Sequence, residues 1–168
     1  MRKKNTLLIL FLLLMLTTLG CQKEEDFSKY TFDYEFVTGN QYFSFEYPND
    51  WEIEENKVSD GEGLPEDMPD FGVHIYMDSN KNNSIYIFEG ISLNMYKDET
   101  FSKSDFMVDG VKRGDLCSLE YEDEIYKLIT FNHNDENHVY RYAFVKAERE
   151  FYNKNETRIV RILESIDF

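Results

Sequence analysis

The sequence has little cysteine. Its 168 residues include two, Cys21 and Cys117, and the first follows an apolar leader. The domain beyond the leader therefore holds one thiol and no internal disulfide. In the stretch CSLEY, Cys117 shares a two-residue period with Leu119 and Tyr121, which predicts a small buried side chain on a strand. No histidine or predicted helix start lies close enough in the sequence to activate this thiol for catalysis.

Basic residues are also scarce. Lys and Arg number 18 against 33 Asp and Glu, for a formal net charge of −15 at pH 7. Nucleic acid requires a basic surface, so it is excluded as a partner. The same charge repels anionic lipid headgroups, which predicts a domain that stands off the bilayer. Solubility is the simplest role for this acidity.

No apolar run is long enough for a membrane-spanning helix. The longest covers ten residues, Leu7 to Leu16, about half of the roughly 20 that a spanning helix needs. Three basic residues, Arg2 to Lys4, precede this run, and small residues follow it. That order is typical of an export signal, so residues 1–20 are predicted to be a signal peptide outside the fold.

A lipid anchor is predicted at the end of this leader. Leu19-Gly20-Cys21 resembles the lipobox of bacterial lipoproteins, in which the cysteine is acylated, although Thr18 stands where that box usually has leucine. Lipid chains anchor stably because each buried methylene contributes about 0.8 kcal/mol. Residues 21–29 would then be a tether, and a single domain over 30–168 would lie at the outer face of the cell membrane. A cleaved signal with an ordinary Cys21 thiol is the alternative.

Motifs of common enzyme classes are missing as well. No glycine-rich phosphate loop follows a predicted strand, and no serine elbow or nucleophile–base spacing occurs. We therefore predict no catalytic residue, no enzyme activity and no cofactor beyond weakly bound divalent cations.

Aromatic residues, by contrast, are abundant at 16%. Many alternate with polar residues, as in Tyr30 to Phe36 and Phe43 to Tyr47, which predicts half-buried strands. Turn-rich segments separate these strands, so the pattern predicts a meandering antiparallel sheet. The expected strands cover residues 30–36, 43–47, 73–77, 91–95, 125–131 and 140–144.

One helix is evident at the end of the chain, where apolar residues recur at spacings of three and four. We predict an α+β domain in which an antiparallel β-sheet packs against helices that include this C-terminal one. The residues that carry the helical period are Phe151, Asn155, Ile159, Ile162, Leu163 and Ile166.

The stretch DSNKNNSIYIFE, residues 78–89, resembles a calcium-binding loop. Asp and Asn alternate from Asp78, and Glu89 stands at the twelfth position, as in an EF-hand. Its flanks are strand-like, however, whereas an EF-hand has helices on both sides, and Asn83 replaces the expected glycine. We therefore predict a hairpin turn rather than a calcium site.

Glu89 falls in phase with the apolar residues Ile85 and Ile87. Either its carboxylate points into an apolar layer or the strand changes phase. Gly90 follows directly, and glycine in a strand often marks a bulge. We expect the bulge.

Two further groups have side chains suited to metals. His133 and His138 flank Asp135 and Glu136, but a tight zinc site needs three or four convergent ligands, so a solvated hairpin loop is the simpler interpretation. The second group is an acidic segment able to attract calcium weakly, whose glycine and proline also suit a mobile loop. Its candidate ligands are Asp60, Glu62, Glu66, Asp67 and Asp70.

The stretch YFSFEYPNDWEI, with Tyr47, Pro48 and Trp51, resembles the start of the PsbP-like (Mog1/PsbP) domain family. MVDGVKRGD is similar to that family's Asp-Gly turn, and YRYAFVKAEREFY with RIVRILESIDF is similar to its last strand and closing helix. The resemblance covers residues 40–168. The middle helix of plant members has no counterpart, because residues 97–113 lack a helical period. We expect the Trp51 ring to anchor the core.

This resemblance implies an α/β/α sandwich and non-enzymatic roles in binding or assembling partners. Metal binding is described for photosynthetic members, but no ligand residues transfer by position. Two hypotheses follow. The first is a membrane-anchored binding module that recognises an unknown protein or small solute through a sheet edge or the acidic loop. The alternative is an extracytoplasmic protein that binds divalent metals.

Overall fold

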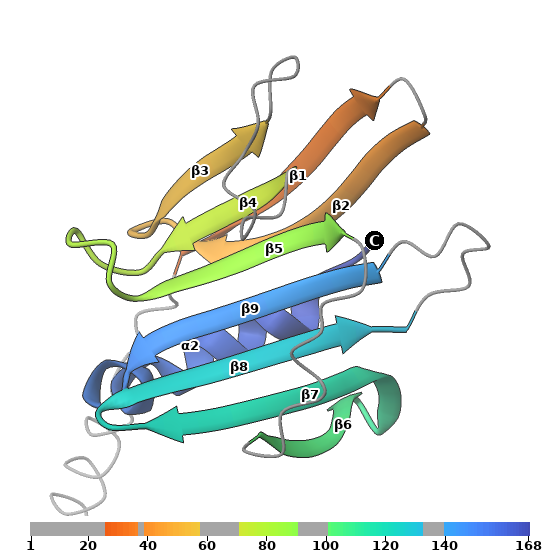
Figure 1. Cartoon of the computed structure of the whole chain (residues 1–168). Coiled ribbons are helices and arrows are strands. Elements are labelled where there is room, and N and C mark those ends of the chain that lie inside the picture. Colours follow the sequence, from red (N-terminus) through yellow and green to blue (C-terminus); the bar gives the residue numbers. More distant parts are fainter. Residues whose placement is uncertain (1–25, 37–38, 58–70, 91–100, 133–139) are drawn as a thin grey trace, which may run out of the picture.

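The computed structural model describes residues 26–36, 39–57, 71–90, 101–132 and 140–168. Seven strands in this part of the chain form one antiparallel sheet, in the order β3-β4-β5-β9-β8-β7-β6, and β1 and β2 form a separate two-stranded ribbon (Figure 1). The elements are β1 Phe27–Phe36, β2 Gly39–Pro48, β3 Glu52–Lys57, β4 Phe71–Tyr76, β5 Ser84–Gly90, β6 Ser102–Val108, β7 Val111–Tyr121, β8 Glu124–Phe131, β9 Tyr140–Glu148 and α2 Arg149–Ser165.

The sheet departs from the expected meander at its centre. Strand β9, late in the sequence, pairs with both β5 and β8. Strand β6 instead lies at the edge of the sheet, where it pairs with β7 through a turn at Asp109 and Gly110. Both turn residues have positive φ, 51° and 78°, as a tight Asp-Gly hairpin requires.

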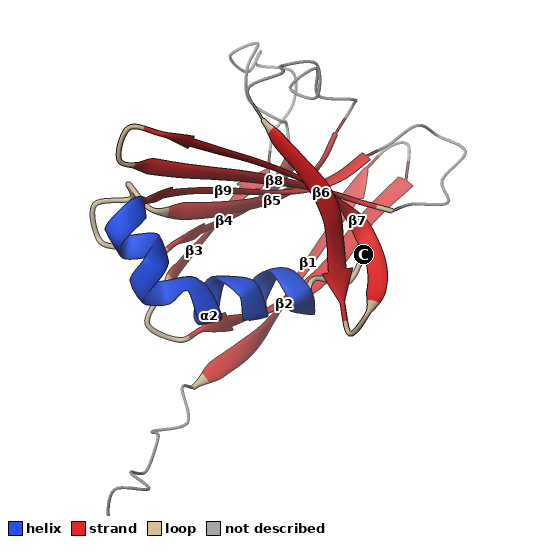
Figure 2. Cartoon of the chain, turned by 90° about the horizontal axis from the view of Figure 1, so that it is seen from below, coloured by secondary structure: helices blue, strands red, loops and turns tan. Residues whose placement is uncertain are grey.

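Helix α2 and the ribbon cover one face of the sheet (Figure 2). The helix buries Tyr152, Ile159, Ile162 and Leu163 against this face, which confirms the predicted C-terminal helix. After Ser165 the chain turns extended and pairs with the ribbon, where Asp167 and Ser44 exchange backbone hydrogen bonds of 2.7 and 2.8 Å. The main hydrophobic core lies between the sheet and the layer formed by α2 and the ribbon.

Trp51 belongs to that core, as predicted, with 6% of its surface exposed. It follows the turn after β2, and its N–H donates to the carbonyl of Pro48 at 3.1 Å. The guanidinium of Arg158 on α2 lies 4.5 Å from the centre of its ring. The tryptophan thus links the turn, the sheet and the helix.

The central strands are buried on both faces, whereas alternation had predicted half-buried strands. Strand β5 shows this most clearly, because every residue from Ile85 to Glu89 is buried. A second apolar cluster therefore lies on the face opposite α2. Its buried members are Tyr86, Phe88, Cys117, Leu128 and Tyr142.

Other expectations are met only in part. The described residues contain one helix, so the packed helices of an α/β/α sandwich are not confirmed. Strand β1 begins at Phe27, inside the segment expected to be a tether. The strand expected at 91–95 lies outside the described residues. In the described part of the chain, no helix has the length and apolar character needed to cross a membrane.

Candidate functional site

The best-formed candidate site is a group of rings on the sheet face that points away from α2. We call it the ring patch. Its rings come from β4, β5, β8 and β9, and strand alternation sends them all to the same face. All its members except Tyr86 are partly exposed. The ring patch consists of His74, Tyr76, Tyr86, Tyr126 and Phe144.

His74 lies between two tyrosines in this patch. Its ring stacks on that of Tyr86 with centroids 3.9 Å apart and planes at 13°, and on that of Tyr76 at 5.4 Å and 7°. The stack continues from Tyr86 to Phe88, with centroids 4.7 Å apart. The pKa of His74 is lowered, chiefly because burial disfavours the charged imidazole. Its Nδ1 is buried and has no hydrogen-bond partner among the described residues.

A second set of rings lies on β8 and β9. Tyr126 and Phe144 have centroids 6.3 Å apart, and Phe144 is the cross-strand neighbour of Tyr86. The Tyr126 hydroxyl donates to Glu124, and this hydrogen bond is the main reason that the pKa of Tyr126 rises to about 12. The rings thus run from β4 across β5 and β9 to β8.

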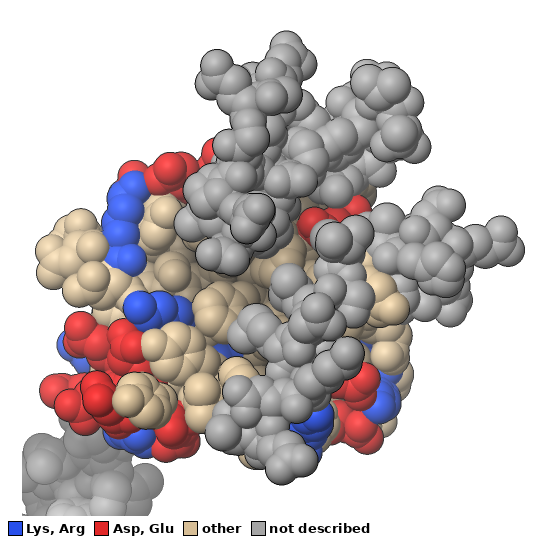
Figure 3. Space-filling view, viewed as in Figure 1, with Lys and Arg blue, Asp and Glu red and all other residues tan. Residues whose placement is uncertain are grey.

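Lysine and glutamate pairs border the patch. Lys81 Nζ lies 2.6 Å from Glu54 Oε2 and 4.3 Å from the centre of the Tyr76 ring. The hydrogen bond between Lys81 and Glu54 lowers the pKa of Glu54 and raises that of Lys81. On the other side, Lys146 Nζ lies 3.3 Å from Glu124. In Figure 3 the described side chains on the left part of this face are mostly uncharged, with Lys or Arg among them, and acidic side chains gather near the β7–β8 turn.

The patch therefore offers flat apolar surface beside exposed charged groups. Aromatic rings provide large contact areas and prefer stacked or edge-on partners. Cations near the rings add electrostatic attraction and polar contacts. The arrangement suits a ligand with a flat, weakly polar face and hydrogen-bonding groups at its edge.

The calcium-like motif forms a hairpin turn between β4 and β5, as predicted. The backbone N–H groups of Asn80 and Asn82 donate to Asp78 Oδ1 at 3.0 and 3.2 Å. The amide of Asn83 donates to the same carboxylate, and its Oδ1 accepts the N–H of Glu148 at 2.7 Å. Asp78 therefore serves the turn by accepting hydrogen bonds from its own loop.

The prediction of a bulge after Glu89 is wrong. Strand β5 stays in register with β9 from Ser84 to Gly90, so the Glu89 carboxylate points to the same face as Ile85 and Ile87. Glu89 is 8% exposed and accepts a hydrogen bond of 2.9 Å from Arg141 Nε. A buried carboxylate persists here because a guanidinium stands opposite it across the strands.

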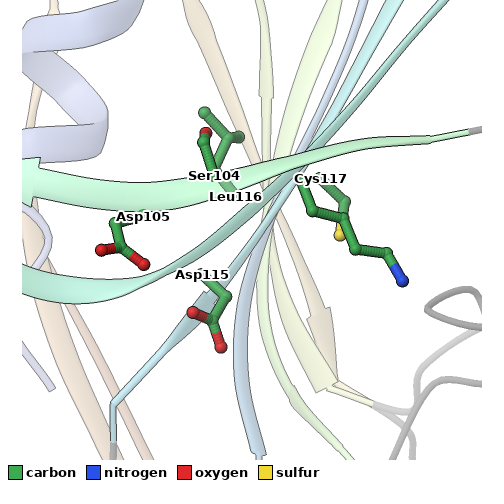
Figure 4. Close-up of a pocket in the computed structure, with 6 residues that line it drawn as sticks. Ser104, Asp105, Asp115, Leu116 and Cys117 are labelled. Carbon is green, nitrogen blue, oxygen red and sulfur yellow. The ribbon is translucent and has the colours of Figure 1, made fainter.

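A small hollow of about 270 Å³ lies at the β6–β7 edge (Figure 4). Lys112 Nζ lies 2.7 Å from Asp105 and 2.8 Å from Asp115, so both carboxylates are paired. Burial raises the pKa of the Cys117 thiol, which is 4% exposed. Cys117 is thus the buried strand residue that its period predicted. The hollow is lined by Lys103, Ser104, Asp105, Asp115, Leu116 and Cys117.

A wider hollow of about 800 Å³ lies between the β7–β8 turn and the start of α2. Arg149 occupies its acidic lining, pairing with Glu120 and donating to the carbonyl of Glu122 at 3.1 Å. In the described part of the chain, no three His, Cys, Asp or Glu residues are placed to hold a metal. The lining residues are Glu122, Asp123, Glu124, Glu148, Arg149, Glu150 and Asn153.

The remaining predicted sites lie outside the described residues. These are the lipidation site Cys21, the histidines His133 and His138, and the whole acidic segment 60–70. The sequence pattern covered His74 only as part of the expected strand 73–77, and it did not reveal the ring patch. The signal for it was the unbroken apolar run from Ile85 to Phe88, which indicates a strand buried on both faces.

Comparison with known proteins finds a likeness among solved structures. No protein-family model matches the sequence, and no curated protein matches it. The chain is similar to the solution structure of cyanobacterial PsbP (CyanoP) from Synechocystis sp. PCC 6803, with 10% sequence identity and a TM-score of 0.48. The match covers 88% of this chain and 95% of that one. A likeness of this size carries no information on ligands or activity.

Proposed function

We propose that this protein is an extracytoplasmic lipoprotein, anchored to the outer face of the cell membrane by Cys21, that acts as a non-enzymatic binding module. The location is supported by the basic, apolar and small residues that precede Cys21. The binding role is supported by the ring patch. The stacked, partly exposed rings of His74 and Tyr76 beside Lys81 carry this proposal.

The ring patch suits recognition because its rings are already ordered. Packing between neighbours fixes the Tyr86 and His74 rings before a ligand arrives, so less conformational entropy is lost on binding. Lysine side chains at the border, each 43% exposed, supply polar contacts around the apolar centre. An apolar centre with a polar rim is the usual anatomy of a recognition surface.

The partner is a protein segment or a small solute that presents a flat, weakly polar face. Aromatic or sugar rings are the chemical groups that stack best on such a surface. Catalysis is not part of the proposal: burial raises the pKa of the Cys117 thiol, and the Asp105 and Asp115 carboxylates near it are both paired with Lys112.

Photocrosslinking in intact cells tests the binding role. A photoreactive phenylalanine analogue replaces Phe144 in the patch or, as a control, Tyr42 of the ribbon, which is 55% exposed. We expect a light-dependent adduct at position 144 and none at 42. A protein partner would give a larger band on a gel, whereas a solute would raise the mass of the intact chain. Absence of any adduct at 144, or equal adducts at both positions, would reject the ring patch.

Cell fractionation tests the anchor separately. The chain with intact Cys21 should sediment with membranes, and Cys21→Ser should move it to the soluble fraction. An unacylated chain with intact Cys21 would refute the anchor and leave the ring patch untouched.

A further inference from the structure

We propose that the protein forms a two-fold dimer by pairing the β6 strands of two copies, antiparallel and centred on Ser104. The first observation is the position of β6 at the end of the sheet. Among the described strands it pairs only with β7. An edge strand presents unpaired backbone N–H and C=O groups, which another strand can satisfy.

The charge pattern of β6 is self-complementary about Ser104. Residues Ser102 to Asp105 are all exposed. In an antiparallel pair centred on Ser104, Lys103 of one copy stands opposite Asp105 of the other, and the symmetry repeats this pair. The Asp105 carboxylate, which also pairs with Lys112 of its own chain at 2.7 Å, would then lie between two lysines. Opposite charges in directly facing positions stabilise a strand pair, and like charges destabilise it. A parallel pairing in register would set Lys103 against Lys103 and Asp105 against Asp105.

The same residues oppose wrong partners. Charged side chains on an edge strand discourage pairing with apolar strands, and the irregular register between Phe106 and Met107 ends the flat part of β6. The flat part of β6 is therefore Ser102 to Phe106, and its charges are complementary to those of the same segment in a second copy. This complementarity favours pairing of β6 with another β6 over pairing with a different strand.

The opposite edge of the sheet does not compete. Strand β3 carries Glu52 and Glu54 on one face, and both side chains are largely exposed. Antiparallel pairing of two β3 strands centred on Ile53 would set Glu52 of one copy opposite Glu54 of the other, and like charges in facing positions destabilise a strand pair. The two-fold pairing through β6 is closed, since it uses the same edge of both copies.

Disulfide trapping in the full-length chain, purified in detergent, tests the geometry. Facing Cα atoms in an antiparallel pair are about 4.5–5.5 Å apart, within reach of a disulfide. Ser104→Cys should therefore cross-link two copies through position 104, with the bond located by mass spectrometry. Ser102→Cys is the matched control, because the two 102 positions would lie roughly 13 Å apart along the strands. Equal cross-linking at both positions, or none at 104, would overturn the proposal.

Charge reversal tests the pairing without a covalent bond. Lys103→Asp should shift the wild-type dimer to monomer in sedimentation, because it faces Asp105 of the other copy. The exchange Lys103→Asp with Asp105→Lys should restore the dimer. Thermal unfolding by circular dichroism checks that each variant folds. A folded Lys103→Asp chain that remains as dimeric as wild type, or an exchange variant that stays monomeric, would contradict the inferred register.

Discussion

The imidazole of His74 stacks on the phenol ring of Tyr86 with their centroids 3.9 Å apart. The two residues are Cα partners on adjacent strands, so the sheet itself sets this contact. Glu54 on β3 is the neighbour of His74 on the other side, and Lys81 from the following turn pairs with that glutamate. A titratable ring is thus held inside an apolar stack with one ion pair beside it.

Stability should fall in mild acid because of His74. Its pKa in the folded chain lies below the ordinary value of 6.5, so the unfolded chain binds a proton first as the pH falls. The contribution of neutral His74 to the free energy of unfolding is therefore complete above pH 6.5 and is lost progressively below it. His74→Phe keeps the stacking and removes the titration. The melting temperature of this variant minus that of wild type should therefore become more positive as the pH falls from 7 to 5. A difference that stays constant over this range would show that His74 does not titrate as described.

The Arg141 and Glu89 pair should respond unequally to its two single substitutions. Arg141 is 29% exposed and Glu89 8%, so Glu89→Leu leaves a cation that can reach water, whereas Arg141→Leu leaves a buried carboxylate. Loss of a buried partner costs about 1–3 kcal/mol, and Arg141→Leu should cost more. The double variant should be more stable than Arg141→Leu, because it leaves no buried carboxylate that has lost its guanidinium. Urea unfolding measures all three, and a double variant less stable than both singles would contradict this view.

Glu89→Gln tests the hairpin assignment of the calcium-like motif. Because Glu89 is bound to Arg141 and Asp78 accepts hydrogen bonds within its own turn, calcium affinity should be the same in this variant and in wild type. An EF-hand would lose its bidentate ligand. Calorimetric titration makes the comparison. Any divalent binding should be weak and should vanish when Asp60, Glu62, Glu66, Asp67 and Asp70 become amides; tight binding lost in Glu89→Gln would refute the turn.

Trp51→Ala should destabilise the fold strongly. The ring is 6% exposed and packs in the main core beneath Arg158. Truncation of a buried large ring costs about 3–5 kcal/mol. Chemical denaturation should show this loss, and wild-type fluorescence should be that of a buried indole. An unchanged denaturation midpoint together with exposed-type fluorescence would place Trp51 at a surface instead.

Local features of the fold could be predicted from the sequence because short-range chemistry determines them. The Asp109-Gly110 turn, the Asp78 turn and the amphipathic α2 all depend on residues close in the chain. Tertiary pairing could not be predicted. Nothing local to β9 shows that it lies between β5 and β8. The position of the Glu89 carboxylate on the apolar face is explained only by Arg141, which lies opposite it on β9.

The ring patch was hidden for a related reason. Alternation assigns one buried face to each strand, whereas β5 buries Tyr86 on one face and Ile85 on the other. Which rings become neighbours depends on strand order, and strand order is a long-range property. The sequence contained the rings, and the sheet brought them together.

The most direct test of the binding role places the photoreactive residue at Ser84, which stands beside Tyr76 in the cross-strand row of the patch. Adduct yield is then compared between chains carrying Phe144→Ala and chains carrying Tyr42→Ala. Removal of a central ring from a recognition surface typically costs more than about 1 kcal/mol of binding energy. We expect a several-fold loss of adduct for Phe144→Ala and no change for Tyr42→Ala. Equal yields in both chains, with folding intact, would contradict the binding role.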